Sequence, residues 1–470
     1  MTSRLDDVRP DDYPCVAGAA DYGEIYLEES QGLGIRLEDS SVDDVASVSE
    51  RGLAVRFLRR RGQAVETLHG SANSTDPATA ARLGRELLGG KALRAGQGRS
   101  LRLNSRRQPM RTDPMKVPLD NKISMLRLMN SLVRAEFPHV RQVTVSYAER
   151  RKVFAVINSD GAFRKEDRTG LLLAVTVVAE KDALLQTGTA SVGAIKGFEL
   201  LGGQVPTDLC RTAARRAVSK LEAPKAKAGE MTVVISSSAG GTLIHEAIGH
   251  SLEADAIQEG ASPAYKGKLG LAVAPETVSI IDDPTLPSLR GSFAFDDEGI
   301  ETGPTVLVKN GVLSDFLYDR STAMKEGRSS NGHGRRESFF CRPIPRMSNL
   351  YIAPGPDDPA AILRSLKAGV FVTHMGSGQV NTTTGEFVFE VDEGYWVEDG
   401  RVRHLVRDVN LLGVGPEVLR SIDRLGSDLG WGIGSCGKDG QTVPVTDGQP
   451  TMRIPKLLIG GRHEAAAAGV

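Results

Sequence analysis

One segment near the middle of the chain restricts the fold more than any other. A run of β-forming residues, 231–235, leads into small and polar residues, 236–241, and a helical pattern follows. That helix carries His245, Glu246 and His250. Two histidines just over one turn apart, with a carboxylate beside one of them, can hold a divalent metal and keep a base next to it. The segment therefore predicts a strand, a glycine-rich turn and a metal-binding helix.

The spacing of the two histidines predicts a distorted helix. His245 and His250 are at positions i and i+5, which a regular helix separates by roughly 140° around its axis. Both can bind one metal only if the helix widens into a π turn or ends early, and Gly249 is where such a distortion costs least. The alternative is an ordinary amphipathic helix with one buried and one exposed histidine. The adjacent Glu246 and the preceding glycine turn favour the metal site.

A catalytic zinc needs a third protein ligand besides two histidines. Glu253 and Asp255 are the near candidates, and Cys436 is the distant one. Cys436 lies among glycines in residues 432–441, so we expect it on a tight loop where its thiolate has steric freedom. An indifferent surface cysteine explains the same residues equally well. Cys341 competes less well, because it follows two phenylalanines and is expected to be packed.

The overall composition points to a soluble protein of a reducing compartment. The net charge is −1, which gives no global field toward nucleic acid or membrane. The four cysteines are far apart and form no CxxC pair. No apolar run reaches the roughly 20 residues of a membrane span, and the N-terminus lacks the apolar core of a signal peptide. We expect a cytoplasmic protein without membrane contact.

Length and patterning predict two domains of class α+β. Residues 1–225 are expected to form an α/β domain with an antiparallel meander, followed by a linker at 223–229. Its predicted strands are 23–28, 33–37, 53–59, 140–149, 152–159 and 170–180, and its predicted helices are 75–89, 119–136 and 206–221.

A basic segment interrupts this domain. Residues 96–118 are rich in arginine, contain proline and show almost no apolar periodicity. A nucleic-acid-binding arm is one interpretation. We favour a solvated connector, because no aromatic residues interleave with the charges for base stacking. Binding to nucleic acid is therefore not expected.

Residues 226–470 are expected to form a β-rich, barrel-like or sandwich-like domain that carries the metal helix. Asn310-Gly311 and Asp399-Gly400 mark tight turns between strands. Predicted strands are 278–282, 305–309, 316–319, 379–380, 386–391, 395–398, 402–405 and 452–459, with helices at 359–368 and 416–425.

Several motifs together resemble one known family. The metal motif, residues 245–250 followed by Leu252-Glu253, is similar to that of the TldD/PmbA metalloprotease family, in the TldD-type subunit. Further matches are residues 334–338 with 345–349, 376–380 through 385–389, 436–441 with 448–451 and, more weakly, 24–26 with 37–39. The resemblance covers most of the chain and is strongest from residue 231 onward. Residues 96–111 and the part before Tyr22 depart from the family pattern.

The resemblance implies a function and a ligand set. It implies zinc (Zn2+) held by His245, His250 and Cys436, with Glu246 as the catalytic carboxylate. It implies a proteolytic subunit that pairs with a homologous PmbA/TldE-type subunit as a heterodimer, and self-dimerisation remains open. The implied substrates are short or unfolded peptides, including leader segments of ribosomally made modified peptides.

Six further residues are candidates for binding the substrate. Arg335 and Arg336 can present guanidinium forks to a carboxylate or to a developing oxyanion, and His333 or His374 could serve instead. An ordinary polar loop explains these residues as well. The glycine-rich stretch at Gly376 and Gly378 precedes a strand and could accept an extended peptide as an added strand.

Two other functions compete with a zinc peptidase. The first is a binding or assembly subunit whose zinc is purely structural, with Glu253 or Asp255 filling the position meant for water. The second is a nucleic-acid-associated factor that uses residues 96–116.

Overall fold

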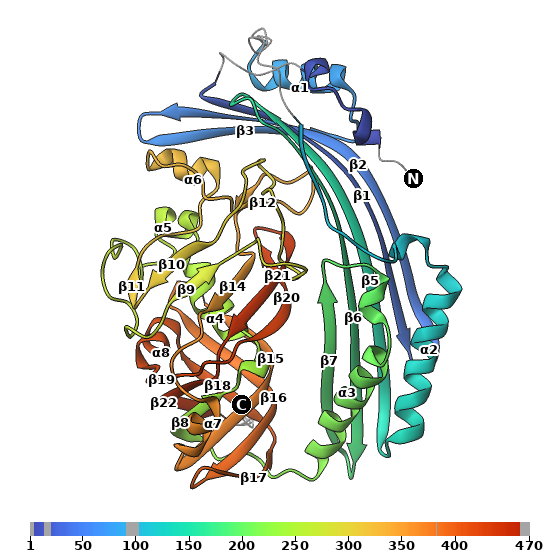
Figure 1. Cartoon of the computed structure of the whole chain (residues 1–470), viewed down its shortest axis with the longest axis vertical. Helices are drawn as coiled ribbons and strands as arrows, with labels where there is room; N and C mark the ends of the chain where they lie inside the picture. The colour runs from blue at the N-terminus through green and yellow to red at the C-terminus, as the bar shows by residue number, and fades with distance from the viewer. Residues whose placement is uncertain (1–3, 14–19, 91–102, 382, 461–470) are drawn as a thin grey trace, which may run out of the picture.

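One long, curved sheet dominates the N-terminal half, which we define as the described residues up to 221 (Figure 1). The computed structural model describes residues 4–13, 20–90, 103–381 and 383–460. The strand order is β3-β2-β1-β5-β6-β4, with β7 also paired to β6. The strands are β1 (Tyr22–Glu38), β2 (Ser41–Arg61), β3 (Ala64–Ala72), β4 (Leu103–Arg107), β5 (Val140–Asn158), β6 (Phe163–Lys181) and β7 (Leu184–Ala194).

Helices cover one face of this sheet. They are α1 (Pro77–Leu87), α2 (Leu119–Glu136) and α3 (Val205–Leu221). The apolar stripes of α2 and α3, including Leu126, Val133 and Ala213, pack with alternate side chains of β5 and β6 into one core. Side chains alternate between the faces of a strand, so the remaining residues point the other way. Near the top of the molecule that second face meets the C-terminal half, where Tyr26, Phe154 and Phe339 share a smaller core.

The strands of this half are longer than the sequence pattern predicts. β1 continues through residues 29–32, where polar side chains predict a turn, and β5 continues through Arg150 and Arg151. The physical reason is that the second half of the chain buries this polar face: Glu28 and Ser30 are almost fully buried. The pattern also misses β7, whose outward residues are largely polar.

The basic segment differs from the predicted connector. Residues 103–107 form β4, a mostly exposed strand that pairs in parallel with β6. Arg107 lies 3.3 Å from Asp167 of β6, so one of its charges is already paired within the chain. Residues 96–102 of the predicted connector lie outside the described residues.

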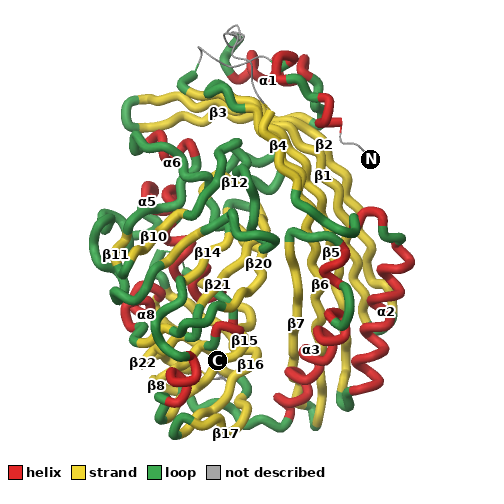
Figure 2. Tube along the Cα trace, viewed as in Figure 1, coloured by secondary structure: helices red, strands yellow, loops and turns green. Residues whose placement is uncertain are grey.

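The C-terminal half, which begins at β8, contains a closed five-stranded barrel. Its strands follow the order β15-β8-β22-β18-β16, and pairing between β15 and β16 closes the circle. The five strands are β8 (Gly229–Ile235), β15 (Ala368–Val380), β16 (Glu386–Glu398), β18 (Val409–Val414) and β22 (Met452–Gly460). β17 (Arg401–Val406) and β19 (Arg424–Leu425) extend it, and α7 (Pro359–Arg364) and α8 (Gly415–Ser421) lie outside the strands (Figure 2). The predicted α+β class and barrel-like second half are confirmed.

A second sheet stacks beside the barrel, in the order β11-β10-β9-β14-β21-β20. Its strands are β9 (Ile280–Asp282), β10 (Thr305–Lys309), β11 (Val312–Leu313), β14 (Asn349–Ile352), β20 (Gly430–Lys438) and β21 (Gln441–Gln449). Between these strands lie the pair β12 (Gly334–Arg335) and β13 (Ile344–Pro345), and the helices α4 (Thr242–Ile244), α5 (Ala254–Glu259) and α6 (Arg320–Lys325). The strand predicted at 316–319 is wrong: Leu317 makes only an isolated bridge to Glu253.

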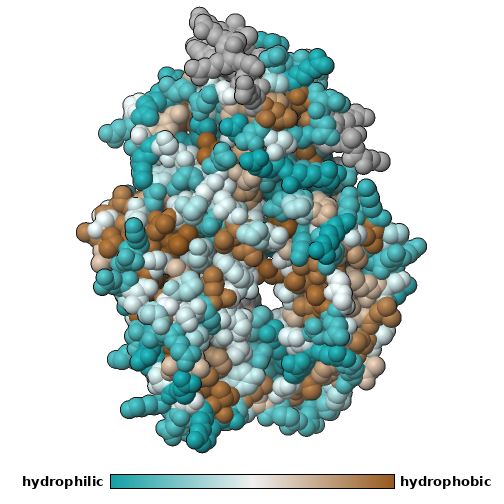
Figure 3. All heavy atoms as spheres, in the orientation of Figure 1, coloured by the Kyte–Doolittle hydropathy of each residue, from teal (hydrophilic) through white to brown (hydrophobic). Residues whose placement is uncertain are grey.

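A buried polar network joins the two halves. Arg336 donates a hydrogen bond to Glu24, and Arg56 forms ion pairs with both Glu24 and Glu298. All four side chains are at most 1% exposed. Below this junction the molecular surface is hollowed between the halves (Figure 3). No helix among the described residues is both long and apolar enough to cross a membrane.

Candidate metal centre

The segment between β8 and α5 contains the predicted helix distortion. The chain leaves β8, turns at Gly240 with φ 74°, and enters α4. Residues His245–Gly249 then form a single π-helical turn, in which the backbone N–H of His250 donates to the carbonyl of His245. An i→i+5 hydrogen bond widens the helix, so residues five apart share one face. The predicted π turn is confirmed.

Gly249 is needed for a reason that differs from the predicted one. Its φ of −58° is helical and open to any residue. A Cβ at this position would lie 2.1 Å from the Met347 sulfur and 2.8 Å from a methyl of Leu350. The glycine therefore lets β14 and the residues before it pack directly against the π turn.

Three side chains converge beside this turn. Ligand atoms of His245, His250 and Cys436 lie within 4.8 Å of one another, and all three residues are buried. The Cys436 sulfur is 3.5 Å from His250 Nε2. The two imidazole rings are 5.1 Å apart and meet edge to face. The distant cysteine that the sequence left open is thus the one brought to the histidines.

Cys436 reaches the cluster from a strand, and the predicted tight loop is wrong. It lies in β20, the edge strand of its sheet, opposite Val443 of β21. The surrounding glycines serve close packing: a Cβ on Gly240 would lie 2.8 Å from the Cα of Gly432. The strand can therefore lie directly against the turn that precedes the metal helix. Arg346 fixes the strand locally by donating to the Cys436 carbonyl.

Carboxylates hold the outer nitrogens of both histidines. His245 Nδ1 is 2.7 Å from Asp447 Oδ1, and His250 Nδ1 is 3.1 Å from Glu253 Oε2. Lys438 in turn donates to Glu253 and Asp255 at 2.9 and 2.7 Å. A carboxylate on Nδ1 fixes the ring orientation and raises the basicity of Nε2, which is the usual support of metal-bound histidine.

Sequence reasoning missed two of these supporting groups. Asp447 and Lys438 lie on β21 and β20, and neither strand was predicted. The available signal was the pairing of residues 436–441 with 448–451 as family motifs: the first motif contains Lys438, and the second begins one residue after Asp447. Without the hairpin register, nothing in the sequence aims Asp447 at His245.

The electrostatics favour a thiolate in the cluster. Burial alone would raise the pKa of the Cys436 thiol, but hydrogen bonds with His245 and His250 outweigh it and lower the pKa to about 5. For Glu253, burial is likewise outweighed, by Lys438 and His250, and its pKa falls to about 2. The thiolate is the form of cysteine that binds metal.

The remaining acids of the segment divide into two kinds. Glu253 supports His250 from behind and Asp255 is bound by Lys438, so neither belongs to the cluster of potential ligands. Glu246 lies on the π turn and is half-buried. Its carboxylate has no hydrogen-bond or ion-pair partner among the residues the structure describes. The carboxylate of the residue that follows His245 in the sequence is therefore uncommitted.

Three family models match consecutive parts of the chain. Residues 23–88, 112–221 and 228–461 match PmbA/TldA metallopeptidase domain 1, the central domain and the C-terminal domain. A metalloprotease TldD homolog of Haemophilus influenzae is 32% identical, over 94% of this chain and 93% of its own. The chain belongs to the TldD/PmbA metallopeptidase family.

Further similar proteins extend this comparison. A metalloprotease of Methanothermobacter thermautotrophicus is 39% identical over 68% of this chain and 70% of its own. A solved structure from Thermotoga maritima, described as a putative modulator of DNA gyrase, has a TM-score of 0.76 at 24% identity, covering 93% and 96% of the two chains. TldE from Thermococcus kodakarensis has a TM-score of 0.69 at 17% identity, covering 94% and 97%. At these identities the structures show a shared fold.

The two arginines of the 334–338 family motif are buried and engaged. Arg335 donates to the carbonyls of Met347 and Pro444. Arg336 donates to Glu24 and to the Asp297 carbonyl within the network between the halves. Both Nη atoms of Arg335 and the Nη2 of Arg336 are thus occupied by protein groups.

The other substrate candidates lie in different surroundings. His333 is fully buried, with Nε2 3.1 Å from Asp282. His374 and Gly376 lie on β15, where residues 374–380 pair with β16 on one side, while β8 pairs with β15 only as far as Val372. A Cβ on Gly378 would lie 1.8 Å from the Phe389 ring, so this glycine is required by core packing.

Proposed function

We propose that this chain is a zinc-dependent peptidase of the TldD type, with His245, His250 and Cys436 as metal ligands and Glu246 as the catalytic carboxylate. The observation that supports it is the convergence of three buried ligand atoms within 4.8 Å, beside a carboxylate that has no partner among the described residues. Three protein ligands are the number that catalytic zinc sites use, because a fourth position must receive water or substrate. Relatives named metalloprotease agree with this interpretation.

The chemistry of the donor set fits zinc. Two imidazole nitrogens and one thiolate form a borderline-soft, mixed set that suits zinc and is poor for magnesium or calcium. The Nδ1 atoms of His245 and His250 are held by carboxylates, so both Nε2 atoms are available to the cluster. Zinc in such a site lowers the pKa of water and polarises a carbonyl group.

The side chains of the centre would divide the remaining work. Glu246 would accept the proton of the attacking water and deliver it to the leaving nitrogen. Asp447 and Glu253 would keep the imidazoles oriented while charge develops. Lys438 would hold Glu253 ionised and in place, because it bonds that carboxylate directly.

We further propose that the substrates are short or unfolded peptides, among them leader segments of modified peptides. The edge of β15 at residues 374–380 supports this, because a strand edge without a neighbour binds an extended backbone with little regard for sequence. Gly376 contributes to that edge. Arg335 and Arg336 would act indirectly, Arg335 by fixing the backbone at Met347 and Pro444 and Arg336 by holding the junction between the halves.

The same proposal includes assembly and location. The partner would be a homologous PmbA/TldE-type subunit or a second copy of this chain, and the fold shared with TldE supports the first. Residues 1–225 and 226–470 would act as its two domains. We expect it to work in the cytoplasm, since the described cysteines Cys210, Cys341 and Cys436 are all free thiols.

The variant Glu246→Gln tests the catalytic assignment. It should keep its zinc and lose peptide hydrolysis by about 100-fold or more, because general-base catalysis contributes factors of this size. Glu259→Gln, an exposed acid at the end of α5, is the matched control and should cleave normally. Metal analysis and peptide cleavage are measured on the same preparations, with and without a candidate partner. Cleavage by Glu246→Gln at the parental rate would reject Glu246 as the base.

The competing function is a non-catalytic subunit with structural zinc. It requires Glu253 or Asp255 in the fourth ligand position. Both carboxylates are instead bound by Lys438, and Glu253 also holds His250 Nδ1. This arrangement favours the catalytic interpretation.

A further inference from the structure

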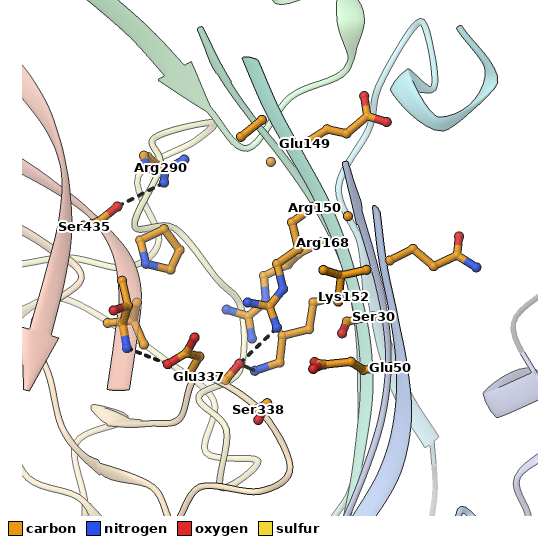
Figure 4. A pocket seen from close by; sticks show the side chains of 18 of the residues that line it. Ser30, Glu50, Glu149, Arg150, Lys152, Arg168, Arg290, Glu337, Ser338 and Ser435 are labelled. Carbon is orange, nitrogen blue, oxygen red and sulfur yellow. Dashed lines mark hydrogen bonds between the residues drawn. The ribbon is translucent and has the colours of Figure 1, made fainter. Parts of the chain in front are cut away.

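A cavity of about 550 Å³ lies between the long sheet and the β20–β21 hairpin (Figure 4). One wall is formed by the polar middle of β1 and β5, including Gly32 and Lys152. The opposite wall includes Ser435 and Pro444 of the hairpin. Ser435 immediately precedes Cys436, so the cavity begins one residue from the cluster.

The cavity contains a guanidinium group without a counter-ion. Arg290 donates from Nε to the Gly434 carbonyl at 3.1 Å and from Nη2 to Ser435 Oγ at 3.3 Å (Figure 4). Among the described residues it has no carboxylate partner, and its Nη1 has no hydrogen bond. Burial lowers the pKa of Arg290, and no neighbouring acid opposes that effect.

Most other cations around the cavity are paired with carboxylates, and the remaining one, Arg335, has both Nη atoms donating to the carbonyls of Met347 and Pro444. Lys152 and Arg168 each lie 3.3 Å from Asp297. Arg150 lies 3.7 Å from Glu28. A partly desolvated cation gains most from an anion that comes to it, and a guanidinium fork matches a carboxylate. Arg290 is therefore the cation best placed to bind one.

The four acids of the cavity do not cancel this preference. Asp297 is paired with Lys152 and Arg168, and Glu149 is paired with Lys122. Glu337 accepts a hydrogen bond from the Thr442 backbone. Glu50, on β2, lies on the wall opposite Arg290 (Figure 4). Glu50, which has no ion-pair partner among the described residues, thus lies across the cavity from Arg290.

We propose that this cavity is a subsite for a carboxylate of the bound peptide, with Arg290 as the residue that selects it. The inference rests on the proposed peptidase function and adds a substrate preference to it. Successive strand residues face opposite sides, so Ser435 faces the cavity while Cys436 faces the cluster. Since β20 is the edge strand of its sheet, an extended peptide can pass this edge. At about 3.3 Å per residue, a few residues of an extended peptide span the distance from the metal cluster to Arg290. The carboxylate belongs either to an acidic side chain or to the free C-terminus.

The test measures binding to the zinc-loaded, full-length Glu246→Gln chain. The probes are three peptides labelled at the N-terminus: a neutral peptide with an amidated C-terminus, the same peptide with a single glutamate moved through its positions, and the neutral peptide with a free C-terminus. Fluorescence anisotropy gives each dissociation constant. The best carboxylate peptide should bind about tenfold tighter than the neutral one, as for a hydrogen-bonded ion pair. The peptide that binds more tightly, the one with the glutamate side chain or the one with the free C-terminus, identifies the source of the carboxylate.

Three substitutions in the same background assign the effect. Arg290→Gln keeps a donor for Gly434 but removes the charge. It should bring the ratio of the neutral peptide's dissociation constant to that of the best carboxylate peptide close to one. Arg290→Lys should retain part of it, and Glu50→Gln should raise it, because it removes the opposing charge. Arg364→Gln, an exposed arginine on α7, should leave the ratio unchanged.

Two results would overturn the subsite. One is equal binding of all three peptides, or no binding; the other is a preference that survives Arg290→Gln. Hydrolysis of the neutral peptide by the parent chain is recorded separately, so the peptidase proposal stands or falls on that result alone.

Discussion

The molecule buries polar side chains in two places, and the two differ in how the charges are used. In the network between the halves, Arg336, Arg56 and Glu24 bond one another and leave no carboxylate of that group free. In the metal centre, three donor atoms point at one another and Glu246 remains without a partner among the described residues. Buried charges are normally paired, so the second arrangement needs a further reason.

The comparison teaches which buried polar cluster is structural. Where every charge has an opposite charge within bonding distance, the group stabilises an interface between elements. Where the outer atoms are held and the inner atoms converge, as with His245 and His250, the group is prepared for something outside the chain. The predictions below separate these two roles.

The largest effect is expected from the cysteine ligand. Cys436→Ser should lose nearly all bound zinc and all peptide hydrolysis while the fold survives, because serine is a far weaker zinc ligand than a thiolate. Cys341→Ser removes a free thiol outside the cluster and is the matched control. Zinc per chain is measured by metal analysis after dialysis. Full zinc in Cys436→Ser would remove the sulfur from the site.

The structural network should show the opposite pattern. Arg336→Met removes a fully buried cation and leaves Glu24 short of one partner, which should lower the free energy of unfolding by about 3 kcal/mol. The folded variant should still bind one zinc. Urea unfolding followed by tryptophan fluorescence gives the change, with the exposed Arg364→Met as control. Loss of zinc from folded Arg336→Met would contradict a purely structural role of the network between the halves.

A smaller effect is expected behind the ligands. Asp447→Asn keeps a hydrogen-bonding group next to His245 but removes its charge, so zinc affinity should fall about 10–100-fold. Competition with a zinc chelator measures it, and Asp120→Asn on the surface of α2 should change nothing. An unchanged zinc affinity would mean that the charge of Asp447 does not support His245 as a metal ligand.

The sequence predicts local geometry at the metal helix better than anything else. The i, i+5 spacing of His245 and His250 demands a widened turn, because that constraint lies within one helix. Local reasoning gives the wrong result for Cys436, because the glycines around it predict a loop and the residue lies in a strand. Their role is the close approach of Gly432 to Gly240, which lies nearly two hundred residues away in the chain.

The lengths of the strands in the N-terminal half were predicted wrongly for a similar reason. Polar residues such as Glu28 and Ser30 indicate a turn when only their neighbours are considered. They continue β1 because β2 and β5 pair with it on both sides, and Lys152 of β5 lies 3.6 Å from Glu28. Asp447 was missed because only the β20–β21 register directs it to His245. What the sequence could not give is, in each case, a contact between distant segments.

X-ray absorption at the zinc edge of the purified, zinc-loaded chain tests the central claim most directly. The account predicts one sulfur at about 2.3 Å and two imidazole nitrogens at about 2.0–2.1 Å, with the sulfur signal absent in any zinc retained by Cys436→Ser. A zinc surrounded only by nitrogen and oxygen in the parent chain would contradict it.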